Sequence, residues 1–289
     1  MSNKLKNILI PTNFSENSRH ALKAAVTFAQ KIKGQIFLYH RSNLPPNWDA
    51  ATDEQKRFNT LAIKRDEELK GQFTDMLSSF QDTGISIQPL HSEGDLLQNT
   101  EDLIEDYKID MVVMGSEGAR GFKEWYSGSN AEMLSETLKV PVLIIKKDFE
   151  EFPLKQVVFA SEFEEDAKKP FLELIELLRN FESTINLLYI CSIKDFVVSQ
   201  EILDKMEAFK DLCSALPCTI HTRAGHSVES GIQFFIKNIR ADLLSLVHHP
   251  KGSFEKLIKG SNSDKLINHL ECPVLSIPAD EKAVEIKRS

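Results

Sequence analysis

Two hydrophobic patterns alternate along the chain. Short apolar runs rich in Val, Ile and Leu are separated by longer stretches in which apolar residues recur at helical spacing. In the first half, the runs predict strands at residues 7–12, 35–40, 85–90, 110–115 and 141–146. The stretches between them predict helices at about residues 17–32, 53–80, 95–107 and 129–138. Because the strands are apolar throughout, we expect helices on both faces of a parallel sheet.

The second half repeats this order. Its predicted strands lie at residues 157–161, 184–190, 219–223, 242–247 and 273–278. The halves also align directly: LKNILIPTNF (5–14) matches LKQVVFASEF (154–163), and FKEWYSGSN (122–130) matches FEKLIKGSN (254–262). The second copy is shorter, and we expect most of the loss in the counterpart of residues 44–80. This internal repeat predicts two tandem α/β domains, residues 1–148 and 149–289, each a doubly wound, five-stranded, Rossmann-like parallel sheet.

Composition and charge narrow the classes of function. Of the 289 residues, 42% are hydrophobic and 27% are charged, as in an ordinary globular protein. The net charge is −8, and both halves are acidic, so neither nucleic acid nor a membrane surface is an expected partner. No apolar run is long enough to cross a bilayer, and the N-terminus lacks the pattern of a signal peptide, which predicts a cytoplasmic protein.

All four cysteines lie in the second half of the chain. They are Cys191, Cys213, Cys218 and Cys272, and no two form a CxxC pair. We therefore expect reduced, mostly buried thiols rather than disulfides or metal ligands.

The loop after the fourth strand carries the strongest candidate chemistry. Gly115 and Gly118 are followed, after nine further residues, by Gly128, Ser129 and Asn130 at the start of a predicted helix. Ligands of open parallel sheets bind at the carboxyl ends of the strands. We expect the first two glycines to take positive φ and admit a ligand, and the later three residues to favour an anion. Taken alone, the glycines could equally shape a turn and Ser129 could cap its helix.

This spacing resembles the ATP-binding loop of the universal stress protein family. The segments NILIPTNFSENS and VPVLIIK are also similar to that family, and the resemblance covers nearly the whole chain, once per half. It implies an adenine nucleotide alpha hydrolase-like fold with ATP as ligand, the loop residues holding triphosphate and ribose. The residues that it implies around the base are Pro11, Thr12, Asn13, His40, Arg41 and Met114.

The chain departs from the family pattern at several positions. Nucleotide-binding relatives usually carry an aspartate where this chain has Asn13, and an amide offers no charge to a divalent metal, so a bound metal is in doubt. In the second half, Val247 and Pro250 replace the first two glycines, although GSN remains at residues 260–262. Valine rarely takes positive φ and proline has no N–H, so we expect no equivalent ATP site there.

Four residues of the second half are candidate metal ligands. Glu162, His226, His248 and His249 lie at or near strand ends, and histidine with carboxylate suits Zn²⁺ or Ni²⁺. No short ligand spacing such as HxH or HExxH is present, so surface histidines at loop ends are the favoured interpretation.

Three functions remain in order of preference. The first is a stress-response protein that binds an adenine nucleotide in its first domain and acts as a sensor or regulator through an unidentified protein partner. The second is an interaction or scaffold protein of the same fold that binds no nucleotide. Slow ATP hydrolysis is the least favoured, because the sequence contains no Walker lysine, nucleophile elbow or paired catalytic acids, and we expect no enzyme.

The fifth strand of each half would leave an open sheet edge. Single-domain members of the resembled family dimerise through this edge. We therefore expect residues 141–146 to pair with residues 273–278 in a pseudo-dimer within one chain, with a further homodimer left open.

Overall fold

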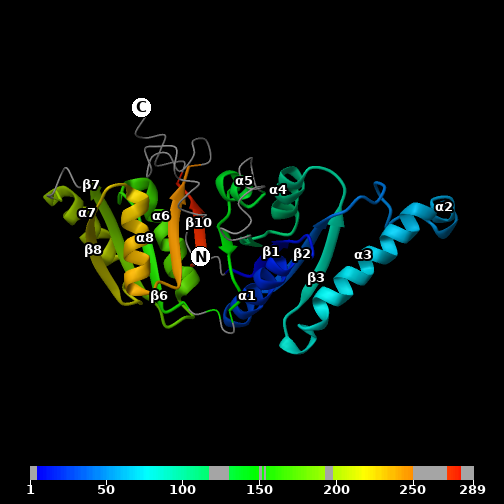
Figure 1. The fold of residues 1–289 in the computed structure, drawn as a ribbon, viewed down its shortest axis with the longest axis horizontal. Helices are drawn as coiled ribbons and strands as arrows, with labels where there is room; N and C mark the ends of the chain where they lie inside the picture. The colour runs from blue at the N-terminus through cyan, green and yellow to red at the C-terminus, as the bar shows by residue number, and fades with distance from the viewer. Residues whose placement is uncertain are drawn as a thin grey trace.

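The computed structural model describes residues 5–116, 130–149, 152, 154–192, 198–249 and 272–280. Within these ranges, ten strands form one sheet in the order β3-β2-β1-β4-β5-β10-β9-β6-β7-β8. The sheet runs the length of the molecule, from α7 and β8 at one end to α2 and α3 at the other (Figure 1). All neighbouring strands are parallel except β5 and β10. The predicted pair of doubly wound, five-stranded units is confirmed.

The first repeat contains, in chain order, β1 (Asn7–Pro11), α1 (Glu16–Ile32), β2 (Gln35–Arg41), α2 (Asp53–Arg57), α3 (Thr60–Ser78), the 3₁₀ turn η1 (Gln81–Thr83), β3 (Ile87–Ser92), α4 (Leu96–Asp106), β4 (Met111–Gly115), α5 (Asn130–Thr137) and β5 (Val142–Ile145). The second contains β6 (Gln156–Ala160), the 3₁₀ turn η2 (Glu165–Ala167), α6 (Lys168–Leu178), β7 (Thr184–Ser192), α7 (Gln200–Asp211), β8 (Cys218–Gly225), α8 (Val228–Ile239), β9 (Leu243–His248) and β10 (Val274–Pro278). No helix in the described ranges has both the length and the apolar character needed to cross a bilayer.

Two sequence predictions about the first repeat are wrong in detail. The helix predicted over residues 53–80 is interrupted, and α3 starts anew because the Asn59 side chain accepts a hydrogen bond from the N–H of Ala62. The third strand begins at Ile87, two residues later than predicted, after Gly84 ends η1 in a left-handed conformation. Apolar periodicity reports the buried face, and capping side chains decide where an element starts.

Each face of the sheet has its own core. Helices α1, α3, α6 and α7 bury their apolar sides against one face, and α4, α5 and α8 against the other. Both cores continue from the first repeat into the second. On the α1 face, the ring of Phe28 lies 4.9 Å from that of Phe181, which follows α6. Aromatic burial of this kind stabilises the contact between repeats.

The junction between the repeats is made by the two edge strands. Strand β5 pairs antiparallel with β10, with Ile144 opposite Val274. This confirms the predicted pairing of residues 141–146 with 273–278, which gives each exposed edge a partner. The hydroxyl of Ser276 donates to the carbonyl oxygen of Ser135 at 2.9 Å, adding a polar tie across the junction.

The two repeats agree in hydrogen-bonding detail. The carboxylate of Asp110 accepts the backbone N–H of Asn7 at 2.9 Å, and its counterpart Asp242 accepts that of Gln156 at 2.8 Å. In each repeat, this aspartate ties the start of the first strand to the turn before the fourth. The duplication therefore preserves side-chain contacts as well as topology.

Candidate functional site

The candidate site lies where the strand order of the first repeat reverses. Strands β1 and β4 are neighbours, with Leu9 opposite Val112. The chain leaves β1 toward β2 and β3, but leaves β4 toward β5 on the other side (Figure 1). Connections that diverge in this way open a crevice at the carboxyl ends of the strands, which is where open α/β sheets bind ligands.

The loop between β1 and α1 forms one wall of the site. Thr12 extends the strand, since its N–H donates to the carbonyl oxygen of Tyr39 at 2.7 Å. The Thr12 hydroxyl accepts the N–H of Phe14 at 2.9 Å, and Phe14 takes a left-handed φ of 61°. Helix α1 then begins after Ser15, whose side chain accepts the N–H of Ser18. Most residues avoid this backbone conformation, and the Thr12 hydroxyl helps to hold it.

Asn13 turns its side-chain oxygen onto the first turn of α1. The oxygen accepts the N–H of Ser15 at 3.1 Å and the hydroxyl of Ser18 at 2.8 Å. Its amide nitrogen makes no hydrogen bond to any residue in the described ranges and lies at an exposed position. Asn13 therefore offers a ligand two N–H donors and no charge.

Gly115 is required at the end of β4, but not for the reason expected from the sequence. Its φ does not lie in the left-handed region, so the expectation of positive φ is wrong. A Cβ at this position would instead stand 2.1 Å from the carbonyl oxygen of Asn17 and 2.9 Å from the N–H nitrogen of Ser18. Only glycine lets β4 and the first turn of α1 approach so closely, which brings the two walls of the crevice together.

His40 approaches the same loop from β2. Its Nδ1 lies 2.8 Å from the carbonyl oxygen of Thr12, and its ring centroid lies 4.6 Å from that of Phe14. Burial lowers the pKa of His40, and the nearby His91 and Arg41 lower it further, while the hydrogen bond to Thr12 opposes them. His40 is therefore neutral at pH 7.

The remaining residues predicted for the nucleotide site differ in burial and in the element that carries them. Pro11 and Met114 are buried at the ends of β1 and β4, Arg41 is exposed at the end of β2, and Asn130 begins α5. Gly118, Gly128 and Ser129 lie outside the described residues. Direct contacts thus link Thr12, Asn13, His40 and Gly115 through one loop.

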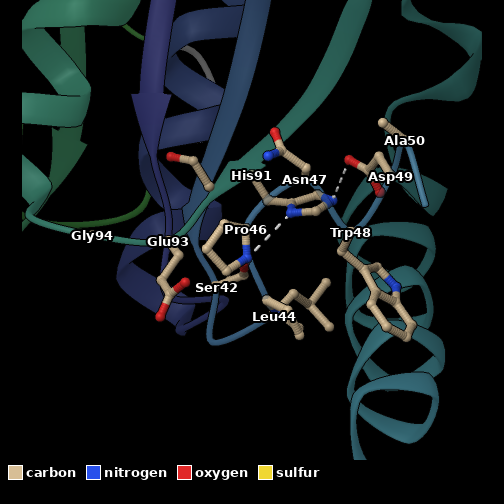
Figure 2. A pocket seen from close by; sticks show the side chains of 12 residues that line it. Ser42, Leu44, Pro46, Asn47, Trp48, Asp49, Ala50, His91, Glu93 and Gly94 are labelled. Carbon is tan, nitrogen blue, oxygen red and sulfur yellow. Dashed lines mark hydrogen bonds and ion pairs between the residues drawn. The ribbon is translucent and has the colours of Figure 1, made fainter. Parts of the chain in front are cut away.

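A pocket of about 600 Å³ adjoins the site on the side of β3 (Figure 2). The loop after β2 and the end of β3 line it. His91 lies inside with both ring nitrogens engaged, because Nε2 is 3.1 Å from a carboxylate oxygen of Asp49 and Nδ1 is 3.4 Å from the hydroxyl of Ser42. His91 is also the register partner of His40 across β2 and β3. The contact between His91 and Asp49 ties the long loop after β2 to the sheet.

The second repeat is built differently at the equivalent place. Val247 stands where the first repeat has Gly115, and its side chain is buried in the core. The helix after β6 begins as the 3₁₀ turn η2, and α6 becomes α-helical only at Lys168, without a side-chain cap. The N–H of Asp280 donates to the carbonyl oxygen of Asp166 in this turn at 3.1 Å. Pro250 and residues 260–262 lie outside the described residues.

The four candidate metal ligands of the second repeat are not gathered together. His248 is 1% exposed and contacts Ser276 and the carbonyl oxygen of Leu138 at the junction. His249 lies 3.9 Å from Asp166, whereas Glu162 and His226 are exposed. Within the part of the chain that the structure describes, no group of three or more His, Cys, Asp or Glu side chains could hold a metal ion.

Sequence reasoning missed Phe14 and Ser18, which shape the loop around Thr12 and Asn13. A left-handed phenylalanine has no signature in one segment, but Phe163 occupies the matching position of the second copy with φ 58°. The aligned PTNF and ASEF segments were therefore an available signal. Nothing in the sequence indicates that the Ser18 hydroxyl reaches Asn13.

The fold and the crevice define the class of protein as a tandem pair of Rossmann-like, doubly wound α/β units. Residues 4–146 and residues 153–278 each match the universal stress protein family, so the chain belongs to that family with two copies of its domain. This agrees with the resemblance seen in the glycine spacing.

Individual relatives are similar to one copy or to both. Universal stress protein Slr1230 of Synechocystis is 24% identical, over 94% of this chain and 99% of its own length. Universal stress protein MJ0577 of Methanocaldococcus jannaschii is 27% identical, over 51% of this chain and 98% of its own length. The crystal structure of a universal stress protein from Archaeoglobus fulgidus covers 96% of this chain and 98% of its own, with a TM-score of 0.71 and 20% identity. Because the similarity to the Archaeoglobus fulgidus structure extends over both repeats, it supports the two-copy fold.

Proposed function

We propose that this chain is a stress-response regulator that binds an adenine nucleotide, ATP, in the crevice of its first repeat and does not act as an enzyme. The observation that carries the proposal is the close approach of Gly115 to the first turn of α1. It brings the start of the glycine-spaced loop against the wall formed by Thr12 and Asn13. Nucleotides bind at such junctions because backbone N–H groups and helix N-termini favour phosphate.

The chemistry of the described site residues fits a nucleotide. Asn13 offers amide donors to ribose or base oxygens, and His40 offers a neutral aromatic ring. Arg41 adds a positive charge, and none of the eight described site residues carries a carboxylate. A polyanion therefore meets no negative charge from this set, and a divalent cation finds no carboxylate among these residues. The proposal accordingly needs no metal held by the protein.

The second repeat supports the first rather than duplicating its function. Val247 fills the position of Gly115, and the turn at η2 has no α-helical N-terminus at the point where α1 begins. We therefore expect one nucleotide per chain, with residues 149–289 holding the shared sheet. A ligand stabilises the conformation that it binds. The fraction of the protein in the bound conformation would therefore rise with the nucleotide concentration, and a protein partner that recognises this conformation would sense that concentration.

Isothermal titration calorimetry with ATP tests this proposal. We expect one equivalent of ATP to bind the intact chain, with little change when a chelator removes divalent cations. Gly128→Val should abolish binding, and the matched Gly260→Val in the second repeat should leave it unchanged. Absence of heat at millimolar ATP would favour the scaffold alternative. Two equivalents would refute the single site, and ADP released above a protein-free blank would overturn the non-enzymatic proposal.

A further inference from the structure

The tautomer of His40 follows from its contact with Thr12. A carbonyl oxygen can only accept a hydrogen bond, so Nδ1 of His40, 2.8 Å from that oxygen, must carry the proton. A neutral imidazole has one N–H. Nε2 therefore keeps a lone pair and acts as an acceptor.

Packing keeps the ring of His40 neutral and oriented. Burial lowers the pKa of His40, and its electrostatic interactions with His91 and Arg41 act in the same direction. The ring lies against Phe14, and Phe14 in turn meets Phe73 of α3 edge-on at 5.0 Å. The acceptor at Nε2 is thus part of a fixed wall, as specific recognition requires.

Nε2 of His40 is also available to a ligand. It makes no hydrogen bond to any residue within the described ranges, and it is not among the buried polar atoms that lack partners. The neighbouring His91 is different, because Asp49 and Ser42 engage both of its nitrogens (Figure 2). Two histidines side by side in the sheet therefore differ in one property: only His40 offers a free acceptor.

We infer that Nε2 of His40 is a specificity-determining acceptor that selects a purine carrying an amino group at position 6. This inference rests on the proposed function. Adenine presents an amino donor at position 6, whereas hypoxanthine and guanine present a carbonyl oxygen there. With those bases, the 6-carbonyl oxygen and Nε2 would face each other lone pair to lone pair, which costs affinity.

Competition between ATP and ITP, which differ at position 6 and in the N1 proton, tests the inference without any variant. On the native chain, we expect ITP to bind on the order of tenfold more weakly than ATP. The triphosphate of unsubstituted purine riboside should fall between them, since it loses the hydrogen bond without adding the lone-pair repulsion.

His40→Phe then identifies the residue responsible. Phenylalanine keeps a ring against Phe14 but has no acceptor, so the ratio of ATP to ITP affinity should fall to about one. The matched variant His91→Phe should retain the native ratio, and thermal melts of both variants check folding.

Each result separates the inference from the proposed function. Equal ATP and ITP affinities in the native chain, or an unchanged preference in folded His40→Phe, would overturn the role of His40 while nucleotide binding stands. If neither nucleotide binds the native chain, the proposed function fails and the inference fails with it.

Discussion

Acid should weaken this protein through His248 at the junction of the repeats. The side chain is 1% exposed, its Nδ1 lies 2.8 Å from the hydroxyl of Ser276, and its Nε2 lies 3.3 Å from the carbonyl oxygen of Leu138. Burial lowers the pKa of His248 to about 4, with a smaller contribution from His249, against the opposing hydrogen bond to Leu138. Leu138 follows α5 of the first repeat, and Ser276 lies in β10 of the second.

The sign of the effect follows from which state binds the proton. Above pH 6.5, the ordinary pKa of histidine, His248 is neutral in both the folded and the unfolded chain and does not change stability. Between about pH 6.5 and pH 4, His248 is protonated in the unfolded chain but not in the folded chain. The free energy of unfolding therefore decreases as the pH is lowered through this range. At about 1.4 kcal/mol per pKa unit, the full loss is about 3 kcal/mol.

Urea denaturation measured by circular dichroism at a series of pH values checks this prediction. Because His40 and His221 also have lowered pKa values, the comparison must be with a variant. His248→Asn should remove about 3 kcal/mol of the acid-dependent loss, whatever its stability at neutral pH. His226→Asn, at an exposed position, should keep the native pH dependence. Parallel curves for the native chain and His248→Asn would refute the reasoning.

Two further predictions concern the packing of the repeats. Gly115→Ala should lower the free energy of unfolding by at least about 2 kcal/mol, because the added Cβ would meet the carbonyl oxygen of Asn17 at 2.1 Å. The control Gly71→Ala has no neighbour within 4 Å in α3 and should instead stabilise the chain by roughly 0.5–1 kcal/mol in the same urea titration. Asp110→Ala and Asp242→Ala should each cost about 1–3 kcal/mol, since each removes the acceptor of the first strand N–H and of the N–H just before it. A large difference between these two variants would contradict the structural equivalence of the repeats.

The alternation of apolar strands and helical stretches was enough to predict the fold class and the element order. It succeeded because burial on both faces leaves its period in the sequence. The repeat alignment added that Asp110 and Asp242 occupy equivalent places, and the structure gives them the same hydrogen bonds. The interrupted helix at Asn59 escaped prediction, since a single side-chain cap leaves no periodic trace.

The candidate site was predicted in position but not in mechanism. The glycine spacing located the carboxyl end of β4, yet Gly115 serves a close backbone contact with α1 and not a positive φ. The sequence placed His40 at the end of a strand but could not reveal which nitrogen carries the proton. That depends on the Thr12 carbonyl oxygen, 28 residues away in the chain.

The pattern of residues along the chain was enough to predict two copies of a doubly wound α/β unit, the strand edges that pair, and the copy that retains the glycine spacing. These properties depend on residue type and on spacing along the chain. Only the folded chain shows that β4 and α1 meet in close contact beside the crevice, that Nε2 of His40 makes no hydrogen bond to any described residue, and that His248 is buried between the repeats. Those properties depend on distances between groups that are remote in sequence, and only packing sets such distances.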